Sequence, residues 1–411
     1  MLNIGRGRRD LLIALAGRMV SAFGDGVALV ALTLRLQADG ADPYEVGLLL
    51  AAGVTPQLLL ARPIGRLVDS HDSRRLLVAG GLVEVAVTVP LVFLHAVVPL
   101  VLLVAALGAV ASTTGATWSA LMPRVVGEEH LAQAISAQQA LGVLALVGAP
   151  AVGGLLAGAF GSGVPVAFDA ATFVVLTVAA ALVRTRRVPD RVAAGPEPAR
   201  GGFAILRADR LLAPLLGGTA LVVLLVGMVD VVLVYLVRET LHAGAVWYGV
   251  AEASWLVGMV AGSVGAGRVG DERGRVRATI AGAAVACAGV VGFALAPAVW
   301  ILVPLSVFGG IGNGYAGTCM STLLMSRTPD SARGRVSAAA NAIFGGAQGG
   351  SLLLGGAVAV VLSPRAIYAV AGLLGLGAAA LLAVTTASRT PGRAPSLRRD
   401  AAVTGGPQAN V

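Results

Sequence analysis

The stretch Gly65-Arg-Leu-Val-Asp-Ser-His-Asp-Ser-Arg-Arg75 is a short charged segment between two long apolar runs. A second copy, Gly267-Arg-Val-Gly-Asp-Glu-Arg-Gly-Arg-Val-Arg277, begins 202 positions later in a chain of 411 residues. Other landmarks recur at nearly the same offset: Met122 with Met325, Gly153-Gly154 with Gly355-Gly356, and Asp25 with Asp230. A shared offset of about half the chain length indicates that one structural unit occurs twice.

The composition excludes a soluble protein. Hydrophobic residues make up 57% of the chain and charged residues 12%, and the mean hydropathy is +0.86, whereas a soluble domain carries about 25% charged residues. In lipid every backbone polar group must be satisfied internally, so only helices or closed barrels can span. Apolar runs of about 20 residues suit helices that cross ~30 Å of hydrocarbon. We therefore predict an all-α membrane protein.

The apolar runs predict twelve membrane-spanning helices, six in each half. The first ends near Leu36, and the others cover residues 46–68, 74–95, 99–121, 133–160, 166–184, 211–238, 246–268, 276–296, 299–325, 334–362 and 365–388. The predicted organisation is an N-terminal six-helix half at 1–185, a cytoplasmic linker at 186–210, a C-terminal six-helix half at 211–388 and a disordered cytoplasmic tail at 389–411.

The distribution of arginine predicts the orientation. All 30 basic residues are arginines, and 26 of them lie in the N-terminus, the loops after even-numbered spans and the tail. The opposite loops carry only Arg35, Arg238 and Arg365. Because positive charge accumulates on the cytoplasmic side, we expect a multi-pass protein of the cytoplasmic (inner) cell membrane with both termini in the cytoplasm. Since orientation accounts for the net charge of +9, we expect no nucleic-acid partner.

Two six-helix halves, a basic central linker and a repeated Gly-x-x-x-Asp-x-x-Gly-Arg loop resemble the major facilitator superfamily over nearly the whole chain. The second loop fits this pattern, whereas in the first Asp72 stands where the second glycine is usual. The resemblance implies a secondary transporter built as two pseudo-symmetric six-helix bundles. It also implies a conformational latch at these loops, formed by Gly65, Asp69, Arg74, Arg75, Gly267, Asp271, Gly274 and Arg275.

The physical chemistry of the loops is compatible with such a latch. Glycine lets neighbouring helices approach closely. An aspartate can accept hydrogen bonds from arginines or from a helix N-terminus across the interface between the halves. The alternative interpretation, arginines that only set orientation beside a turn glycine, accounts for the arginines but not for the repeated aspartate.

The segment Gly148-Ala-Pro-Ala-Val-Gly-Gly154 in the fifth span is similar to the Gly-Pro-x-x-Gly-Gly motif of drug:proton antiporters in the same superfamily. The resemblance implies a helix bend that marks exporters, since proline removes a backbone hydrogen bond; plain close packing of the helix remains an alternative. The residues concerned are Gly148, Pro150, Gly153 and Gly154. Strings at 17–26, 121–134 and 333–337 resemble the exporter branch that includes macrolide-efflux and enterobactin-export proteins.

Ionisable side chains inside spans are costly and are therefore functional candidates. We assign proton or substrate binding to Arg18, Asp25, Glu84, Asp230 and Glu252. Desolvation favours the neutral form of a carboxyl group, which suits a proton carrier. By resemblance, Asp25 and Asp230 would face a central cavity from opposite halves. Asp169 and Glu252 lie within two turns of the outer span ends, where extension toward the interface also explains them.

No catalytic pattern accompanies these residues. The chain has no lysine and hence no Walker A loop, and its four histidines are scattered, so we expect a protein without enzymatic activity, cofactor or metal site. The sequence favours a monomeric transporter in the lipid bilayer that exports a small lipophilic or amphiphilic compound, drug or metabolite, in exchange for protons. Two alternatives remain: an importer of a small metabolite on the same fold, and a non-transporting membrane sensor or scaffold.

Overall fold

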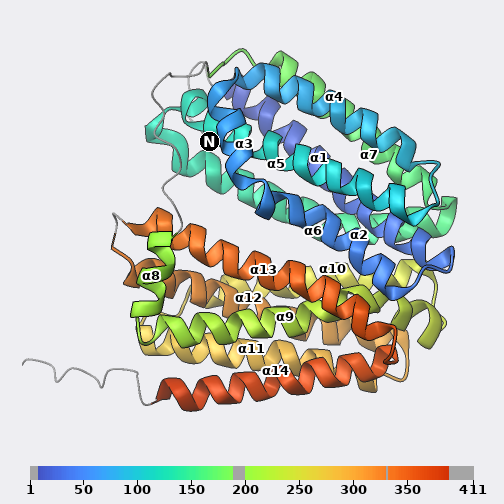
Figure 1. Ribbon diagram of the computed structural model, residues 1–411, viewed down its shortest axis with the longest axis vertical. Helices are drawn as coiled ribbons and strands as arrows, with labels where there is room; N and C mark the ends of the chain where they lie inside the picture. The colour runs from blue at the N-terminus through green and yellow to red at the C-terminus, as the bar shows by residue number, and fades with distance from the viewer. Residues whose placement is uncertain (1–7, 188–199, 330–331, 388–411) are drawn as a thin grey trace, which may run out of the picture.

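The computed structural model describes residues 8–187, 200–329 and 332–387, and it consists of two helical bundles stacked on one another (Figure 1). The N-terminal bundle contains α1 (Arg8–Ala38), α2 (Pro43–Leu59), α3 (Ala61–Ser70), α4 (Ser73–Leu91), α5 (Val97–Val126), α6 (Leu131–Phe160) and α7 (Gly163–Leu182). The C-terminal bundle contains α8 (Arg200–Ala208), α9 (Leu212–Tyr235), α10 (Ala245–Ala266), α11 (Glu272–Leu295), α12 (Leu302–Arg327), α13 (Arg333–Ala359) and α14 (Pro364–Ala387). Short helical turns accompany them at η1 (Glu128–His130), η2 (Leu236–Thr240) and η3 (Val299–Ile301).

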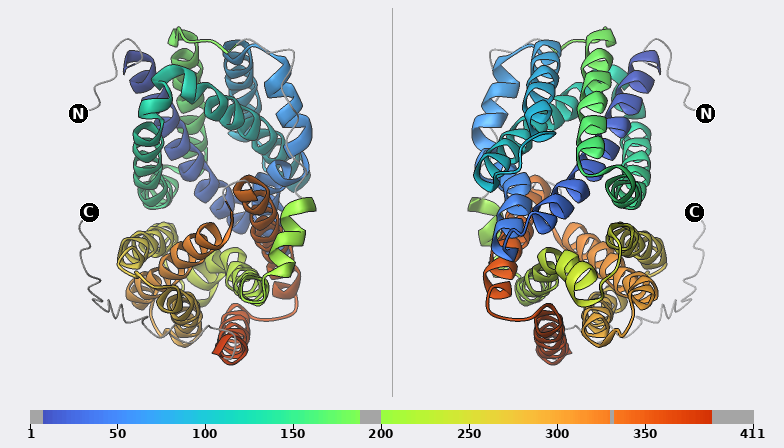
Figure 2. Two further views of the ribbon diagram at one scale, coloured as in Figure 1. Left: turned by 90° about the vertical axis from the view of Figure 1, so that its left-hand side faces the viewer. Right: turned by 90° about the vertical axis from the view of Figure 1, so that its right-hand side faces the viewer.

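The predicted all-α membrane fold with two six-helix halves is confirmed. Among the described residues, ten helices are individually long and apolar enough to cross a membrane, and α2 with α3 forms a further, broken span. The remaining span is α4, which carries Arg74, Arg75 and Glu84 among its 19 residues. The two bundles meet where α6 packs against α10 and where α2 packs against α13 (Figure 2).

The second span differs from the single helix predicted at 46–68, because α2 and α3 meet at an angle of 58°. The break lies at Leu60, whose φ of −98° and ψ of 9° leave the helical region. Pro63 follows three residues later; it has no N–H to donate to the carbonyl of Leu59, and its ring clashes with that carbonyl in a regular helix. The charged segment at 65–75 therefore begins on its own helix, α3.

The predicted linker contains one short helix within its described part. Residues 188–199, like the predicted tail at 389–411, lie outside the described residues. From Arg200 to Ala208 the chain forms α8, which packs against α13. Leu206 of α8 is buried together with Leu211 and Leu215 at the start of the following span. The second part of the linker is thus anchored to the C-terminal bundle.

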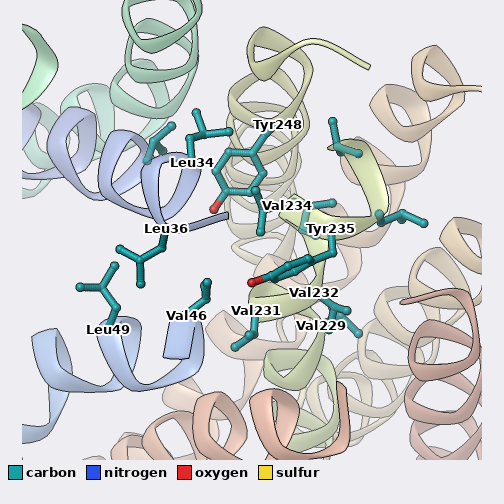
Figure 3. Close-up of a cluster of buried hydrophobic side chains, with 14 of the residues drawn as sticks. Leu34, Leu36, Val46, Leu49, Val229, Val231, Val232, Val234, Tyr235 and Tyr248 are labelled. Carbon is teal, nitrogen blue, oxygen red and sulfur yellow. The ribbon is translucent and has the colours of Figure 1, made fainter. Parts of the chain in front are cut away.

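The apolar core joins the two halves at one end only. A shared cluster includes Leu34, Leu36 and Val46 of the N-terminal half together with Val232 and Tyr248 of the C-terminal half (Figure 3). At the opposite end, where α1 begins and α7 and α14 end, each half has a separate core. One surrounds Leu121 and the other surrounds Leu323. We call the end with the shared core the arginine-poor end, and the end with the two separate cores the arginine-rich end. Within the described residues, the halves therefore share one apolar core at the arginine-poor end and have separate cores at the arginine-rich end.

The three arginines of the arginine-poor end bind backbone carbonyls. Arg35 donates from Nη1 to the carbonyl oxygens of Leu91 at 2.5 Å and Leu94 at 2.9 Å, where α4 ends. Arg365 donates to the carbonyl oxygen of Ala296 at 2.9 Å, just after α11 ends. Arg238 donates to the carbonyl oxygen of Ala243. The C-terminal end of a helix leaves carbonyls without intrahelical partners. Arg35 and Arg365 therefore have structural roles at the ends of α4 and α11, which explains why they lie at the arginine-poor end.

Candidate functional site

Three carboxyl groups lie together inside the N-terminal half, and each comes from a different helix. Asp25 of α1 interacts electrostatically with Glu84 of α4, and Asp169 of α7 interacts with both. A cation is also near them, since Arg18 interacts with Asp25 and with Glu84. We call Asp25, Glu84 and Asp169 the N-half acidic cluster. Three like charges beside one guanidinium repel one another, so the cluster is suited to holding a proton.

The cluster extends from an exposed carboxyl to two buried ones. Glu84 is 1% exposed; its Oε1 accepts a hydrogen bond from Thr114 Oγ1 at 3.1 Å, whereas its buried Oε2 has no partner. Asp169 is 3% exposed and accepts a hydrogen bond from Thr172 Oγ1 at 3.2 Å. Asp25 is exposed at its position on α1. The cluster therefore joins α1, α4 and α7 through one exposed and two buried carboxyl groups.

The position of Asp169 corrects a sequence-based expectation. Extension toward the membrane interface would leave its carboxyl exposed, but the side chain is buried between α7 and α1. Gly24 provides the space, since a Cβ atom at this position would lie 2.5 Å from Asp169 Oδ1. In the sequence, Gly24 next to Asp25 indicates that another group approaches α1 closely at this point. Only the packing of α1 against α7 shows that this group is the side chain of Asp169.

The C-terminal half contains a second acidic group, in a small pocket. Asp230 of α9 and Glu252 of α10 line it and interact electrostatically. The volume of the pocket is about 40 Å³, enough for water but far below the ~300–1,000 Å³ of drug-sized sites. The amide Nε2 of Gln348 lies 3.4 Å from Asp230 Oδ2. Glu252 therefore faces Asp230 rather than the membrane interface, which corrects the alternative interpretation for this residue.

Aromatic and hydroxyl groups complete this C-half pocket. Trp255 and Tyr368 line it, and Tyr368 donates to the carbonyl oxygen of Val229 at 3.3 Å. The Oγ atom of Ser306 is buried there without a partner. Carboxyl groups beside an indole ring are the chemistry that attracts an organic cation. Among the described residues, no group of three or more His, Cys, Asp or Glu side chains is arranged to hold a metal ion.

The two glycine pairs identified as repeat mates make equivalent contacts. In α6, Gly153 lies against α1 of its own half, and Gly154 lies against Gly249 of α10 in the other half. In α13, Gly355 lies against α9 of its own half, and Gly356 lies against α2 of the other half. A Cβ atom added at Gly153 or Gly356 would be less than 3 Å from a backbone carbonyl oxygen of the facing helix. We call the two contacts between the halves, Gly154 against α10 and Gly356 against α2, the glycine seams.

Close packing therefore accounts for Gly153 and Gly154, and a Cβ atom at Gly148 would lie 3.3 Å from the ring of Phe23. Pro150 also belongs to a seam, because its carbonyl oxygen faces Gly249. The helix continues through Pro150 from Leu131 to Phe160. The seams lie toward the arginine-poor end, where the shared core also joins the halves.

The first charged loop contacts α7 and Arg187 of the adjoining linker, and the second contacts residues next to it in the C-terminal half. In the first, Asp69 Oδ1 accepts from Arg187 Nη2 at 3.0 Å, and Arg74 donates to the carbonyl oxygen of Ala181. In the second, Asp271 caps α11 by accepting from the backbone N–H of Gly274 at 3.1 Å, and Arg275 Nε donates to the carbonyl oxygen of Val269 at 3.2 Å. The hydrogen bonds expected across the two halves are not among these contacts.

The two loops differ in which aspartate caps the following helix. Asp72 caps α4 by accepting from the backbone N–H of Arg75 at 3.0 Å, as Asp271 caps α11. Asp72 therefore has the capping role in the first loop that Asp271 has in the second, although Asp69 matches Asp271 by sequence offset. The expected close approach at glycine is absent at Gly65, where, among the described residues outside its own helix backbone, no atom lies within 4 Å of the position that a Cβ would take.

An ion-pair network stabilises the same end of the C-terminal half. Arg327 donates from Nε to Asp209 at 2.9 Å and from Nη1 to Glu272 at 2.6 Å. Burial opposes ionisation of Asp209, but hydrogen bonds from Arg327 and from the backbone N–H groups of Leu212 and Leu211 outweigh it and lower the pKa of Asp209. This network connects the starts of α9 and α11 to the end of α12.

Comparison with known proteins identifies the family to which this architecture belongs. The family model of the Major Facilitator Superfamily matches residues 14–232 and residues 215–406, and the two matches together cover nearly the whole chain. The chain belongs to this superfamily. Its two bundles, with the α6–α10 and α2–α13 contacts between them, are thus those of a major facilitator superfamily transporter.

Among curated members of the superfamily, the chain is similar to macrolide efflux protein A. The protein of Streptococcus pyogenes is 24% identical over 273 residues, which cover 64% of this chain and 67% of the relative. That of Enterococcus faecalis is 25% identical over 236 residues, 54% of this chain and 72% of the relative. These matches confirm the predicted resemblance to the macrolide-efflux branch.

Solved structures of other transporters share the fold. The nucleoside transporter NupG aligns with a TM-score of 0.70 at 12% identity, over 92% of this chain and 98% of that one. A bacterial homologue of the iron transporter ferroportin, described as inward-facing, aligns with a TM-score of 0.68 at 15% identity, over 92% and 98% of the two chains. At these identities the likeness concerns the fold alone.

Proposed function

We propose that this superfamily member exports small lipophilic or amphiphilic compounds through the cell membrane in exchange for protons. The similarity to macrolide efflux protein A supports export of such a compound. The observation that carries the proposal is the presence of one acidic group in each half, the N-half cluster around Asp25 and the C-half pair of Asp230 and Glu252. Uncompensated charge inside a membrane is costly and is retained where it moves ions or substrate.

The orientation follows from the arginine bias. The arginine-rich end would face the cytoplasm, because positive charge accumulates on that side. The halves have separate cores at this end and one shared core at the other, so the conformation described would be open to the cytoplasm. Export would then require the glycine seams and the shared core to part while the arginine-rich ends close, as in alternating access. One chain contains both halves, and we propose that it acts as a monomer.

The two acidic groups have different surroundings, so we assign them different roles in transport. The N-half cluster contains Arg18 and the unpartnered Oε2 of Glu84, so we assign it to the proton, with Asp25 as the exposed entry group. The C-half pocket adds Trp255 to Asp230 and Glu252, which suits a neutral or cationic compound. Because the pocket holds only water-sized groups in this state, substrate would first bind beside it.

Export itself is tested in everted membrane vesicles that contain the full chain. With an imposed pH gradient, acid inside, we expect a macrolide to accumulate in the vesicles, and we expect collapse of the gradient to release it. Vesicles without the protein are the control. Accumulation only in right-side-out vesicles would instead indicate an importer, and no gradient-dependent flux of any tested compound would indicate a sensor or scaffold.

The charged loops would form the latch of the closed arginine-rich end, and Asp271→Asn tests this role. Asparagine caps helices about as well as aspartate, so the N–H of Gly274 keeps its acceptor and the protein should fold. We expect transport to fall several-fold because the charge needed in the other conformation is lost, and Asp69→Asn should have a smaller effect because the first loop departs from the repeated pattern at Asp72. If both variants transport at the wild-type rate with equal amounts of protein in the membrane, the two aspartates do not form a latch and have only their local structural contacts.

A further inference from the structure

The C-half pocket contains two acidic groups without a matching cation. Asp230 and Glu252 line it and interact electrostatically, and both side chains are half-buried. Among the described residues that line the pocket, none is basic, whereas the N-half acidic cluster has Arg18 beside it. Ionisable groups inside a span are costly unless another group compensates their charge. The pocket therefore favours an occupant that brings a positive charge.

The hydroxyl group of Ser306 is a third polar group in this pocket. Ser306 is 1% exposed, and its Oγ atom has no hydrogen-bond partner among the described residues. A buried hydroxyl group without a partner is costly, so it indicates an occupant that supplies one. Ser306 belongs to α12, whereas Asp230 belongs to α9 and Glu252 to α10. Oxygen atoms from three helices thus surround one small space.

The size of the pocket limits which cationic group can enter. Its volume of about 40 Å³ is close to the ~30 Å³ that a water molecule occupies in the liquid. A primary ammonium group is of similar size and carries three N–H donors. A trimethylammonium group has three methyl groups in place of these hydrogens, so it is larger and has no donor. Trp255, which also lines the pocket, adds a surface for a cation–π contact.

We propose that the C-half pocket binds the primary ammonium group of an exported amine, which donates one N–H each to Asp230, Glu252 and Ser306. The inference rests on the proposed function and names the substrate class of the same site. Three donors meet three acceptors, and the rest of the compound lies outside the pocket. The pocket is near the arginine-poor end, because α9 ends there and α10 and α12 begin there. A bound amine is thus close to the side at which an exporter releases it.

The test is equilibrium binding to the full chain in nanodiscs, with binding to empty nanodiscs subtracted. Three probes differ only in their head group: 4-phenylbutylamine, 4-phenylbutyltrimethylammonium and 4-phenylbutanol. The amine is protonated at neutral pH, as the amine of lysine is. We expect it to bind about tenfold or more tightly than the other two, because a site that pairs N–H groups rejects analogues without them. Equal binding of the amine and the trimethylammonium compound would overturn the proposal.

Ser306→Ala tests the third acceptor. It removes a hydroxyl group that has no hydrogen-bond partner among the described residues, so the protein should fold. Affinity for the amine should fall about three- to tenfold, as for the loss of one hydrogen bond, and affinity for the trimethylammonium compound should not change. The matched control is Ser254→Ala, because Ser254 Oγ donates to the carbonyl oxygen of Val250 at 2.7 Å and does not line the pocket. Unchanged affinity in Ser306→Ala, or an equal loss in Ser254→Ala, would contradict the assignment.

The binding experiment and the vesicle experiment separate this inference from the proposed function. Gradient-driven accumulation of a macrolide, by a protein that binds all three probes equally, would overturn the ammonium site and leave proton-driven export standing. Tighter binding of the amine that depends on Ser306, in a protein without gradient-driven flux, would support the site and contradict the exchange for protons.

Discussion

Asp25→Asn is expected to abolish pH-driven accumulation of substrate while leaving substrate binding within about threefold of wild type. Asparagine has the shape of the protonated carboxyl group but cannot release a proton, so the exposed member of the N-half acidic cluster would be fixed in one state. Glu84 and Asp169 would remain buried, and the cluster would no longer contain an exposed group that can bind and release a proton. Proteoliposomes with an imposed pH gradient measure the uphill transport, and equilibrium binding of the same compound measures the affinity.

The control for this substitution is Asp39→Asn. Asp39 lies outside the spans, where it pairs with His95 at 2.6 Å, so loss of its charge should leave accumulation intact. Downhill efflux of preloaded substrate by Asp25→Asn is a further readout, since it needs no proton cycle. Undiminished uphill transport by Asp25→Asn would show that the proton, if one is exchanged, is carried by another group.

Gly249→Val is expected to open the arginine-poor end. A side chain at Gly249 would lie within 3 Å of the carbonyl oxygen of Pro150 and 3.2 Å from Gly154, so α6 and α10 could no longer pack. Overpacking costs about 1–3 kcal/mol, and when that cost applies to one of two conformations it shifts their ratio roughly five- to hundredfold. We expect the conformation described here to become rare and transport to fall accordingly.

The shift can be measured with a cysteine in place of Val46, which is buried in the core shared by the two halves. In a background with Cys287 and Cys319 replaced by alanine, Gly249→Val should make this cysteine react faster with a membrane-impermeant maleimide. The control is Gly142→Val in α6, because no atom of another described helix lies within 4 Å of a Cβ at that position. Unchanged reactivity in Gly249→Val, or an equal increase in Gly142→Val, would contradict the role of the seam.

Much of the fold could be predicted because its signals are local. The helix boundaries agree with the apolar runs to within a few residues, since the length of a span is set by the thickness of the hydrocarbon. The break at Leu60 also had a local cause in Pro63, which the assignment of one apolar run at 46–68 overlooked. Proline acts on the carbonyl four residues before it, so the break falls inside the run rather than at its edge.

The acidic residues were visible in the sequence as costly charges inside apolar runs, but their grouping was not. Asp25 and Asp230 share a repeat offset, and the resemblance implied that they face a central cavity from opposite halves. The structure adds that each interacts with carboxyls of its own half, Asp25 with Asp169 and Asp230 with Glu252. Sequence offset reports duplication, whereas electrostatic interaction depends on which helices are neighbours.

The sequence by itself determined that the protein lies in a membrane, that it has two halves of six spans, and that one end carries the arginines. Composition, run length and charge placement are properties of the chain alone, because lipid and water act on each segment separately. Only the tertiary structure decided that Asp169 joins Asp25, that Asp72 caps α4 as Asp271 caps α11, and that Gly154 and Gly356 contact the opposite half. Those relations arise from the close packing of helices distant in sequence, where a glycine or a carboxyl acquires its role from the neighbour it meets.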